Sequence, residues 1–177
     1  LIPLLSWKGI IQNLNYPHRP RLAEYSFNSL KRAAHIITIS QNTKKDLIKF
    51  CGVKKKNIRV IYNGCGKLFK PLPKKHKEIL RKSKFKFPTD SFLILIMGHQ
   101  SYKNHETALK VLSQLRLKKK NIYIVRLGRK NESWSKLKKY YSLNKYIIEL
   151  NWLKPNEVSE LYNSVDCLLF PSWYEGF

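Results

Sequence analysis

The clearest structural signal in the sequence is the run Phe92-Leu93-Ile94-Leu95-Ile96-Met97-Gly98, an apolar block closed by a glycine. Its length and its content of branched residues are typical of a buried strand. Residues 104–115 follow with apolar positions at helical spacing, and residues 122–127 repeat the strand pattern before Gly128. Strands that alternate with helices of 10–15 residues predict a parallel sheet.

The same alternation extends in both directions from this block. We expect further strands at residues 10–14, 35–40, 58–62, 146–150 and 166–170, and helices over residues 133–141 and 155–162. Another helix is expected after a cap at Ser40 or Asn42, with a stop at Gly52. Between the two series, residues 67–86 hold nine Lys or Arg, one acidic residue and two prolines, which is typical of a linker with a short helix. The fold class is therefore α/β, with two doubly wound, Rossmann-like parallel-sheet domains.

The charge is strongly positive, because 35 Lys and Arg face 11 Asp and Glu and leave a net charge of +24 over 177 residues. Such a charge normally indicates nucleic acid, an anionic membrane or a phosphorylated ligand. Lysine supplies most of the excess, whereas sites that bind phosphate or guanine bidentately rely on Arg. The sequence shows no HTH, RRM or KH pattern. We therefore keep a basic nucleic-acid-binding module without enzymatic activity as the alternative function and not as the leading one.

The cysteines indicate the redox compartment, and the apolar runs indicate whether the sequence holds a membrane span. Cys51, Cys65 and Cys167 are odd in number and lack C-x-x-C spacing, so they predict neither a disulfide framework nor a zinc site. A reducing compartment, the cytoplasm, is the expected location. The apolar runs are of strand length, well below the ~20 residues of a membrane span. Because the chain begins at Leu1 and stops at Phe177 in a strand-to-helix loop, we expect a fragment truncated at both ends.

Candidate binding residues follow the strands, because ligands of doubly wound sheets bind beyond the carboxyl ends of the strands. The strand at 92–97 leads into Gly98 and then Lys103, which would let a backbone and an ammonium group approach a diphosphate. The last strand leads to Glu175, a carboxylate suited to sugar hydroxyls. Together these residues suit a nucleotide sugar. Taken alone, Gly98 is more simply interpreted as a turn glycine, and Lys103 as one surface lysine among many.

Other chemistry finds little support. The sequence has no G-x-G-x-x-G or Walker A pattern, and His99 and His105 lack the spacing of H-E-x-x-H. Surface or capping roles are the simpler interpretation of these histidines. We expect no cofactor and no bound metal.

Several segments, in order from about residue 10 to the end, resemble the GT-B glycosyltransferases of the group 1, or family 4, type. Residues 33–40, followed by a helix and by residues 58–64 with 69–71, are similar to the end of the acceptor domain of that family. Gly98 with Lys103-Asn104 is similar to its glycine loop and Lys-Asn signature. Residues 161–177 resemble its "LY..AD....PS..EGF" segment, the most specific of these similarities.

The resemblance implies a two-domain enzyme of hexosyltransferase type (EC 2.4) that transfers a sugar from a nucleotide-sugar donor with retention of configuration and without a metal. The acceptor would be a glycan or a lipid-linked molecule, as in cell-envelope polysaccharide biosynthesis. Residues 1–66 would be the end of the N-terminal acceptor-side domain, residues 67–90 the basic interdomain linker, and residues 91–177 part of the C-terminal nucleotide-sugar-binding domain.

The resemblance also assigns roles to residues. Lys103 would pair with the donor diphosphate, and Glu175, the first glutamate of an E-x7-E motif, would contact the donor sugar; these two are the catalytic candidates. The donor-binding set comprises Gly98, His99, Lys103, Asn104, Glu175, Gly176 and Phe177. His99 stands where the family often has Arg, and Gly98 lies one residue closer to Lys103 than in many members. The second glutamate would lie beyond Phe177, so we expect this fragment alone to be inactive.

The basic segments raise one further possibility, compatible with the first. Residues 67–86 and 133–145 would hold a peripheral protein against the anionic inner face of a membrane, at ~1 kcal/mol per well-placed basic residue. The interpretation of both segments as solvated faces is equally open.

Overall fold

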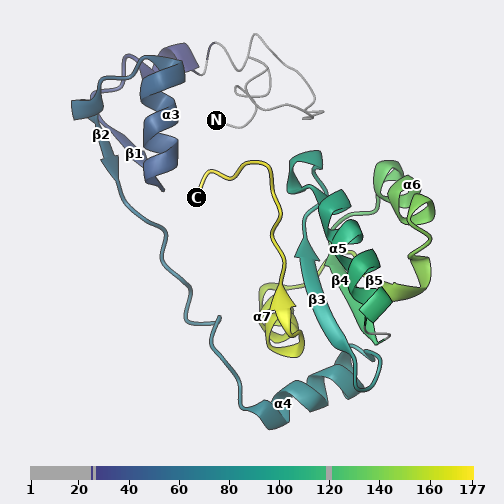
Figure 1. The fold of residues 1–177 in the computed structure, drawn as a ribbon. Coiled ribbons are helices and arrows are strands. Elements are labelled where there is room, and N and C mark those ends of the chain that lie inside the picture. The colour runs from purple at the N-terminus through teal and green to yellow at the C-terminus, as the bar shows by residue number, and fades with distance from the viewer. Residues whose placement is uncertain (1–24, 26, 119–120) are drawn as a thin grey trace. The chain divides into compact units, whose positions relative to one another are not determined.

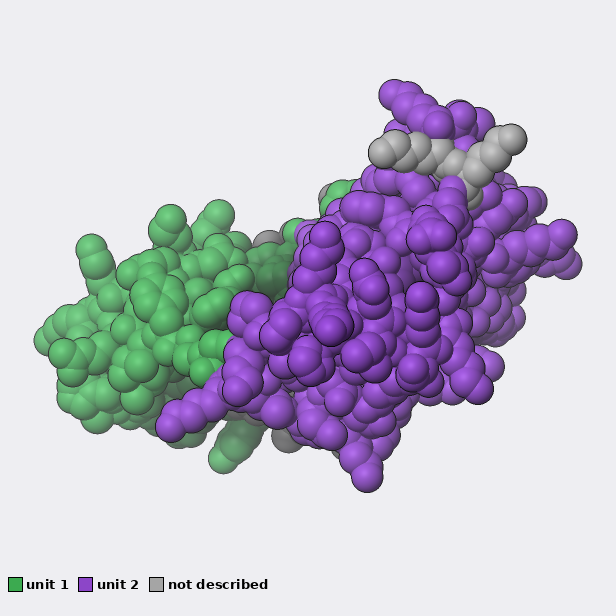
Figure 2. Space-filling view, turned by 90° about the horizontal axis from the view of Figure 1, so that it is seen from below, with its two compact units in different colours: residues 1–65, 173–177 green, residues 66–172 purple. Residues whose placement is uncertain are grey.

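The structure, a computed structural model, describes residues 25, 27–118 and 121–177. It divides into two compact units, one of residues 1–65 with 173–177 and one of residues 66–172 (Figure 2). Among the described residues, each unit has its own parallel sheet, of two strands in the first and four in the second. The strand expected at residues 10–14 lies outside the described residues.

In the first unit, strands β1 (Ile36–Thr38) and β2 (Ile58–Val60) pair in parallel and are joined through helix α3 (Gln41–Cys51) (Figure 1). The ends of α3 match its sequence. Ser40 is extended and its hydroxyl accepts a hydrogen bond from Thr43 N–H, while Gly52 ends the helix in the left-handed conformation at φ 65°. The core between helix and strands consists of Leu47, Cys51, Val53 and Ile58.

The second unit contains the larger sheet, all of it parallel. In the order in which they lie side by side, its strands are β5 (Ile147–Leu150), β4 (Ile122–Leu127), β3 (Phe92–Met97) and β6 (Cys167–Leu168). Strands β3 and β4 pair over their whole length, from Phe92 opposite Ile122 to Met97 opposite Leu127. Both strands are buried on both faces of the sheet, which explains why their sequences are almost entirely apolar.

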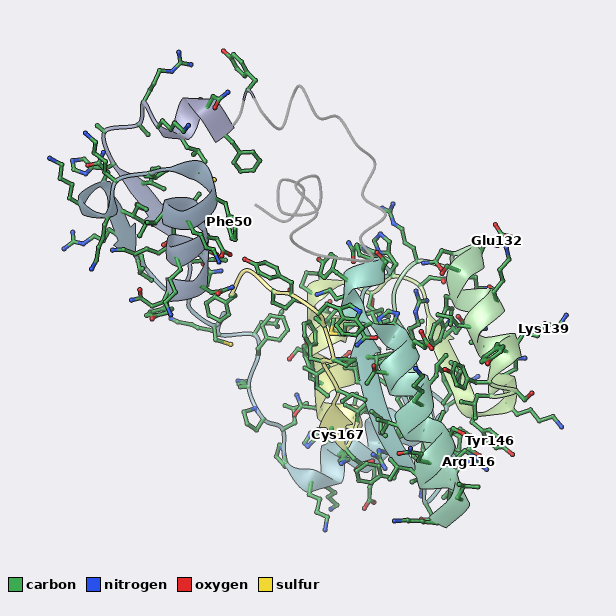
Figure 3. All side chains as sticks on the ribbon, turned by 45° about the horizontal axis from the view of Figure 1, so that its top comes forward. Phe50, Arg116, Glu132, Lys139, Tyr146 and Cys167 are labelled. Atoms are coloured by element: carbon green, nitrogen blue, oxygen red, sulfur yellow. The ribbon has the colours of Figure 1, made fainter. Side chains whose placement is uncertain are left out.

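Helices cover both faces of this sheet, and alternate residues of β3 face each side. Ile94 and Ile96 pack in one core beneath α5 (His105–Lys118) and α6 (Glu132–Tyr140). Leu93 and Leu95 pack in the other core, with residues of α7 (Pro155–Ser164). At the carboxyl-terminal end of α5, Arg116 lies over the ring of Tyr146, with 3.1 Å from its guanidinium carbon to the ring centroid (Figure 3).

The basic segment before β3 forms a helix that ion pairs hold in place. It comprises α4 (Lys74–Ile79) and a π-helical turn at Leu80–Lys84, together called the α4 segment below, at the position where the sequence predicts a short helix. Asp166 accepts from Lys77 at 2.8 Å and from Arg81 at 2.5 Å, and Lys84 pairs with Glu160. Several cations of this segment are therefore bound to carboxylates within the second unit.

Asp166 stays ionised because its partners outweigh its burial. Burial alone would raise the pKa of this carboxyl group, but hydrogen bonds from Lys77, the backbone N–H of Leu93 and Arg81 lower the pKa below its usual value. The side chain thus joins the α4 segment to the first residues of β3.

The α/β class with parallel, doubly wound sheets is confirmed, and β3 and β4 have the predicted bounds. Strand β6 is shorter than the predicted 166–170, because it pairs with β3 only at Ile94 and Leu95. Within residues 25, 27–118 and 121–177, no helix is both long and apolar enough to cross a bilayer.

Candidate functional site

The strand order of the second unit defines a site at the carboxyl ends of β3 and β6. The chain runs from β3 outward to β4 and β5 and then returns to the other side of β3 as β6 (Figure 1). The order of connections therefore reverses between β3 and β6, and such a switch point is where open parallel sheets bind ligands. The segments that flank this point are residues 98–104 after β3 and residues 169–172 after β6.

The first of these segments, residues 98–104, is called the glycine loop below. It starts at Gly98 with φ 95°, a conformation that side-chain-bearing residues rarely adopt. The loop also meets the next one closely, since a Cβ atom on Gly128 would lie 2.2 Å from the carbonyl oxygen of Gly98. Both glycines predicted to end strands are thus required by the backbone at this edge of the sheet.

The glycine loop ends in a 3₁₀ turn at Ser101–Lys103, followed by Asn104 at φ 52°. Asn is one of the few residues that tolerate this left-handed conformation. Its side-chain Nδ2 donates to the carbonyl oxygen of Pro171 at 3.0 Å. The ammonium group of Lys103 lies 4.4 Å from the ring centroid of Phe170, so residues of both segments meet at the switch point.

A buried arginine, which the sequence reasoning did not identify, supports the loop after β4. The side chain of Arg126 is fully buried, and it donates to the carbonyl oxygens of Gly128 at 3.2 Å and Arg129 at 2.9 Å. Its guanidinium lies 4.8 Å from the ring centroid of Trp134, and its Nε has no hydrogen-bond partner among the described residues. Burial lowers the pKa of Arg126, and nearby Glu149 opposes that shift.

Glu149 supplies the countercharge beneath this loop. It accepts from the indole N–H of Trp134 at 2.5 Å and from Lys138 at 2.7 Å. Burial alone would raise the pKa of Glu149, but the hydrogen bonds from Lys138 and Trp134 lower it. The carboxylate, the indole and the buried guanidinium thus form one polar cluster below the 128–131 loop.

His105, the first residue of α5, is buried, which corrects the expectation of a surface or capping role. It is 9% exposed, its Nε2 lies 3.2 Å from the carbonyl oxygen of Met97, and its ring meets that of Trp134 edge-on. Burial lowers the pKa of His105 to about 4, with a smaller contribution from Arg126. The ring is therefore neutral near pH 7 and donates Nε2–H to the carbonyl of Met97.

The C-terminal segment 173–177 belongs to the first unit, where it lies against the start of α3. The hydroxyl groups of Ser40 and Thr43 both donate to the carbonyl oxygen of Gly176 at 2.6 Å. The hydroxyl of Tyr174 donates to the carboxylate of Asp46. Burial, followed by this bond, raises the pKa of Tyr174.

The predicted donor-binding residues therefore fall into two groups. Gly98, His99, Lys103 and Asn104 form one loop of the second unit, and Glu175, Gly176 and Phe177 lie in the first unit. In the first unit, Asn42 donates to the carbonyl oxygen of Glu175 at 3.3 Å, and the ring of Phe177 lies edge-on to Tyr62. Over the part of the chain that the structure describes, no three His, Cys, Asp or Glu side chains gather as metal ligands would.

Two family models match the chain. Residues 4–65 match "Glycosyltransferase Family 4", and residues 76–177, more than half of the chain, match "Glycosyl transferases group 1". Among curated proteins, the chain is 26% identical over 186 residues to the serotype-specific mannosyltransferase WbdA of Escherichia coli, covering all of the chain and 22% of WbdA. The chain thus spans about a fifth of the length of the curated relatives it matches.

Solved structures share the fold. Sucrose-phosphate synthase from Thermosynechococcus elongatus matches 98% of this chain with 44% of its own, at a TM-score of 0.79 and 18% identity. HepE of Anabaena in complex with UDP-glucose matches 90% of this chain with 44% of its own, at a TM-score of 0.73 and 16% identity. WaaG, a glycosyltransferase involved in lipopolysaccharide biosynthesis, matches 96% of this chain with 48% of its own, at a TM-score of 0.71 and 18% identity. The expected GT-B fold is confirmed, and the chain belongs to the group 1 glycosyl transferases.

Proposed function

We propose that this chain is part of a glycosyltransferase that moves a hexose from a nucleotide-sugar donor to a glycan or lipid-linked acceptor. The observation that carries the proposal is the glycine loop, which presents Lys103 at the switch point of a parallel sheet. Two comparisons support it, since HepE has been crystallised with UDP-glucose and WbdA is a mannosyltransferase. Family membership does not favour the alternative of a nucleic-acid-binding module.

In the proposed reaction, the bond between the sugar C1 and the β-phosphate oxygen breaks, and an acceptor hydroxyl oxygen bonds to C1. The acceptor proton is released to water, and the nucleoside diphosphate departs with an additional negative charge. Lys103 would stabilise that charge, and a preorganised cation at a developing anion is often the largest contribution to catalysis. Glu175 would hold the hydroxyl groups of the donor sugar, with the backbone at Gly176 and Phe177 beside it. Gly98 and His99 would border the diphosphate.

We propose retention of configuration and metal independence, as the resemblance to the family implies. The anomeric configuration of the product, measured by NMR at early times, tests the first. The transfer rate in excess EDTA tests the second, because a metal-dependent enzyme would lose its activity there. An inverted product or loss of activity in EDTA would contradict the corresponding proposal.

The main experiment uses the full-length protein with a panel of UDP-, GDP- and ADP-sugars. One donor is expected to raise the unfolding temperature and to support transfer, since a ligand that binds only the folded state stabilises it. Lys103→Ala should lower kcat/KM for that donor by about 10²–10³-fold. Lys139→Ala, on the exposed side of α6 (Figure 3), is the matched control and should leave kcat/KM unchanged. Equal rates for Lys103→Ala and the parent would remove Lys103 from the reaction.

We also propose a cytoplasmic protein that meets the inner face of an anionic membrane. The support is the exposed lysines of the basic segment, Lys74, Lys75, Lys82 and Lys86. Flotation with anionic and with neutral vesicles tests this contact. Equal behaviour with both vesicle types would overturn it.

A further inference from the structure

The glycine loop is bonded on both sides by asparagine side chains. The strand order places β3 between β4 and β6, so the loop after β3 lies between the loops after those strands. On the β4 side, Nδ2 of Asn131 donates to the carbonyl oxygen of His99 at 3.0 Å. On the β6 side, Nδ2 of Asn104 donates to the carbonyl oxygen of Pro171 at 3.0 Å. Lys103 lies in the loop held between these two bonds.

Each asparagine also has a backbone role that does not need its side-chain nitrogen. Asn131 is the N-cap of α6, and its Oδ1 accepts from Trp134 N–H at 2.7 Å. Ser fills an N-cap about as well as Asn. Asn104 takes the left-handed conformation at φ 52°, which Gly adopts without strain. The amide nitrogens are therefore available to hold the loop, independently of the helix cap and the backbone conformation.

Lys103 needs such support because a lysine side chain is long and flexible and contributes a mobile point charge. Its ammonium group lies over the ring of Phe170, the residue immediately before the Pro171 carbonyl that Asn104 holds. The Asn104 bond therefore fixes together the backbone that carries Lys103 and the ring beneath its charge. Small displacements of a catalytic group from its productive geometry can cost about a hundredfold in rate.

We propose that Asn104 and Asn131 are positioning residues, whose side-chain NH₂ groups hold the glycine loop so that Lys103 meets the donor diphosphate. This inference rests on the proposed function, because it assumes that Lys103 acts on the leaving group. It gives Asn104 a role through Lys103 rather than a direct contact with the donor. Neither asparagine needs to touch the substrate.

The test uses two substitutions in the full-length protein that keep each backbone role and remove only the amide. Asn104→Gly keeps the left-handed residue, and Asn131→Ser keeps the helix cap. The matched control is Asn121→Ser, because Nδ2 of Asn121 also bonds two carbonyl oxygens, those of Thr89 and Asp90, at the amino end of β4. Asn104→Gly and Asn131→Ser, called the clamp variants below, should each lower kcat by at least about tenfold while the donor KM changes less. This is expected when an interaction acts mainly in the transition state.

A double-mutant cycle tests whether the asparagines act through Lys103. In a Lys103→Ala background, Asn104→Gly and Asn131→Ser should each change kcat by less than about threefold, because the group that they position is gone. Amide hydrogen exchange in residues 98–104 should be faster in both clamp variants than in the parent and in Asn121→Ser. The midpoints of denaturant unfolding should stay close to that of the control.

The inference is overturned if both clamp variants retain kcat within about twofold, or if their effects persist in full without Lys103. It is also overturned if Asn121→Ser causes the same loss of kcat. A parent protein that transfers no sugar from any donor contradicts the proposed function instead. In that case the exchange of residues 98–104 still decides whether the two amides hold the loop.

Discussion

The glycine loop and the α4 segment are both fixed in the second unit, but by different kinds of bond. The loop is held by side-chain donors on main-chain carbonyl oxygens, those of His99 and Pro171. The α4 segment is held by ion pairs, with Lys77 and Arg81 on Asp166. A carbonyl oxygen can hold a loop without adding a formal negative charge, whereas a carboxylate next to Lys103 would oppose the binding of a diphosphate. In this molecule the ion pairs of the basic segment lie away from the edge of the sheet where an anion would bind.

The largest expected effect is at the backbone contact of the loop. Gly128→Ala would place a Cβ atom 2.2 Å from the carbonyl oxygen of Gly98, so one of the two loops must move. We expect a loss of at least about 3 kcal/mol in the free energy of unfolding, measured by chemical denaturation. Gly64→Ala, where a Cβ would meet nothing within 4 Å, should cost much less. Equal losses would mean that the two loops are not locked together.

The next effect is the pH dependence contributed by His105. Its pKa of about 4 in the folded protein lies below the 6.5 of an unfolded chain, so between these values the unfolded state binds more protons. Stability should therefore fall as the pH is lowered from about 6.5 to about 4, by up to about 3 kcal/mol.

The control for this pH dependence is His105→Gln, which keeps a donor for the carbonyl of Met97 and cannot titrate. Denaturant unfolding of both proteins between pH 7 and pH 4.5 isolates the histidine, since the carboxyl groups titrate mainly below that range. An equal slope in the two proteins would contradict a neutral, buried His105.

A smaller effect, and one that depends on salt, is expected at the α4 segment. Asp166→Asn removes the charge that pairs with Lys77 and Arg81 and should cost about 1–2 kcal/mol, because the carboxylate is only partly exposed. The cost should shrink between 0.05 and 0.5 M NaCl, with unfolding measured at each concentration. The cost of Asn104→Gly should not change with salt, and a shared salt dependence would remove the distinction between the two regions.

The smallest effect is expected at the surface pair on α6. Glu132 and Lys136 form an exposed i,i+4 ion pair at 2.7 Å. Glu132→Gln should change the free energy of unfolding by no more than about 0.5 kcal/mol. Because this pair holds no segment in place, the variant gives the baseline for removing a surface charge. A cost as large as that of Asp166→Asn would contradict the expected difference between the two sets of ion pairs.

The sequence predicted what depends on neighbouring residues along the chain. The apolar run at residues 92–97 and the stop at Gly52 each have a local cause and appear in the structure, and Ser40 is the cap of the two candidates that the sequence offered. Arg126 was missed because it lies inside the run of residues 122–127 and was taken as part of an apolar strand. A single charged residue at an inward-facing strand position was the available signal, since such a residue stays buried only with partners.

The partners of the asparagines could not be predicted, for a different reason. Asn104 and Asn131 are polar loop residues whose local sequence suits a turn and a helix cap. Their bonds to Pro171 and His99 depend on the order β5-β4-β3-β6, which brings together residues 67 and 32 positions apart. Sequence periodicity predicts the strands but not their order. The candidate site at the carboxyl ends of the strands could therefore be predicted, but the hydrogen bonds between its loops could not.

The close approach of Gly128 to Gly98 has a consequence for exchanging loops between relatives. A loop transplanted from a relative after β3 alone would meet a β4 loop shaped for a different backbone path, and the same holds for a transplant after β4 alone. The two loops, with Arg126 beneath the second, would therefore have to be exchanged together, along with residues 169–172, whose Pro171 carbonyl accepts from Asn104.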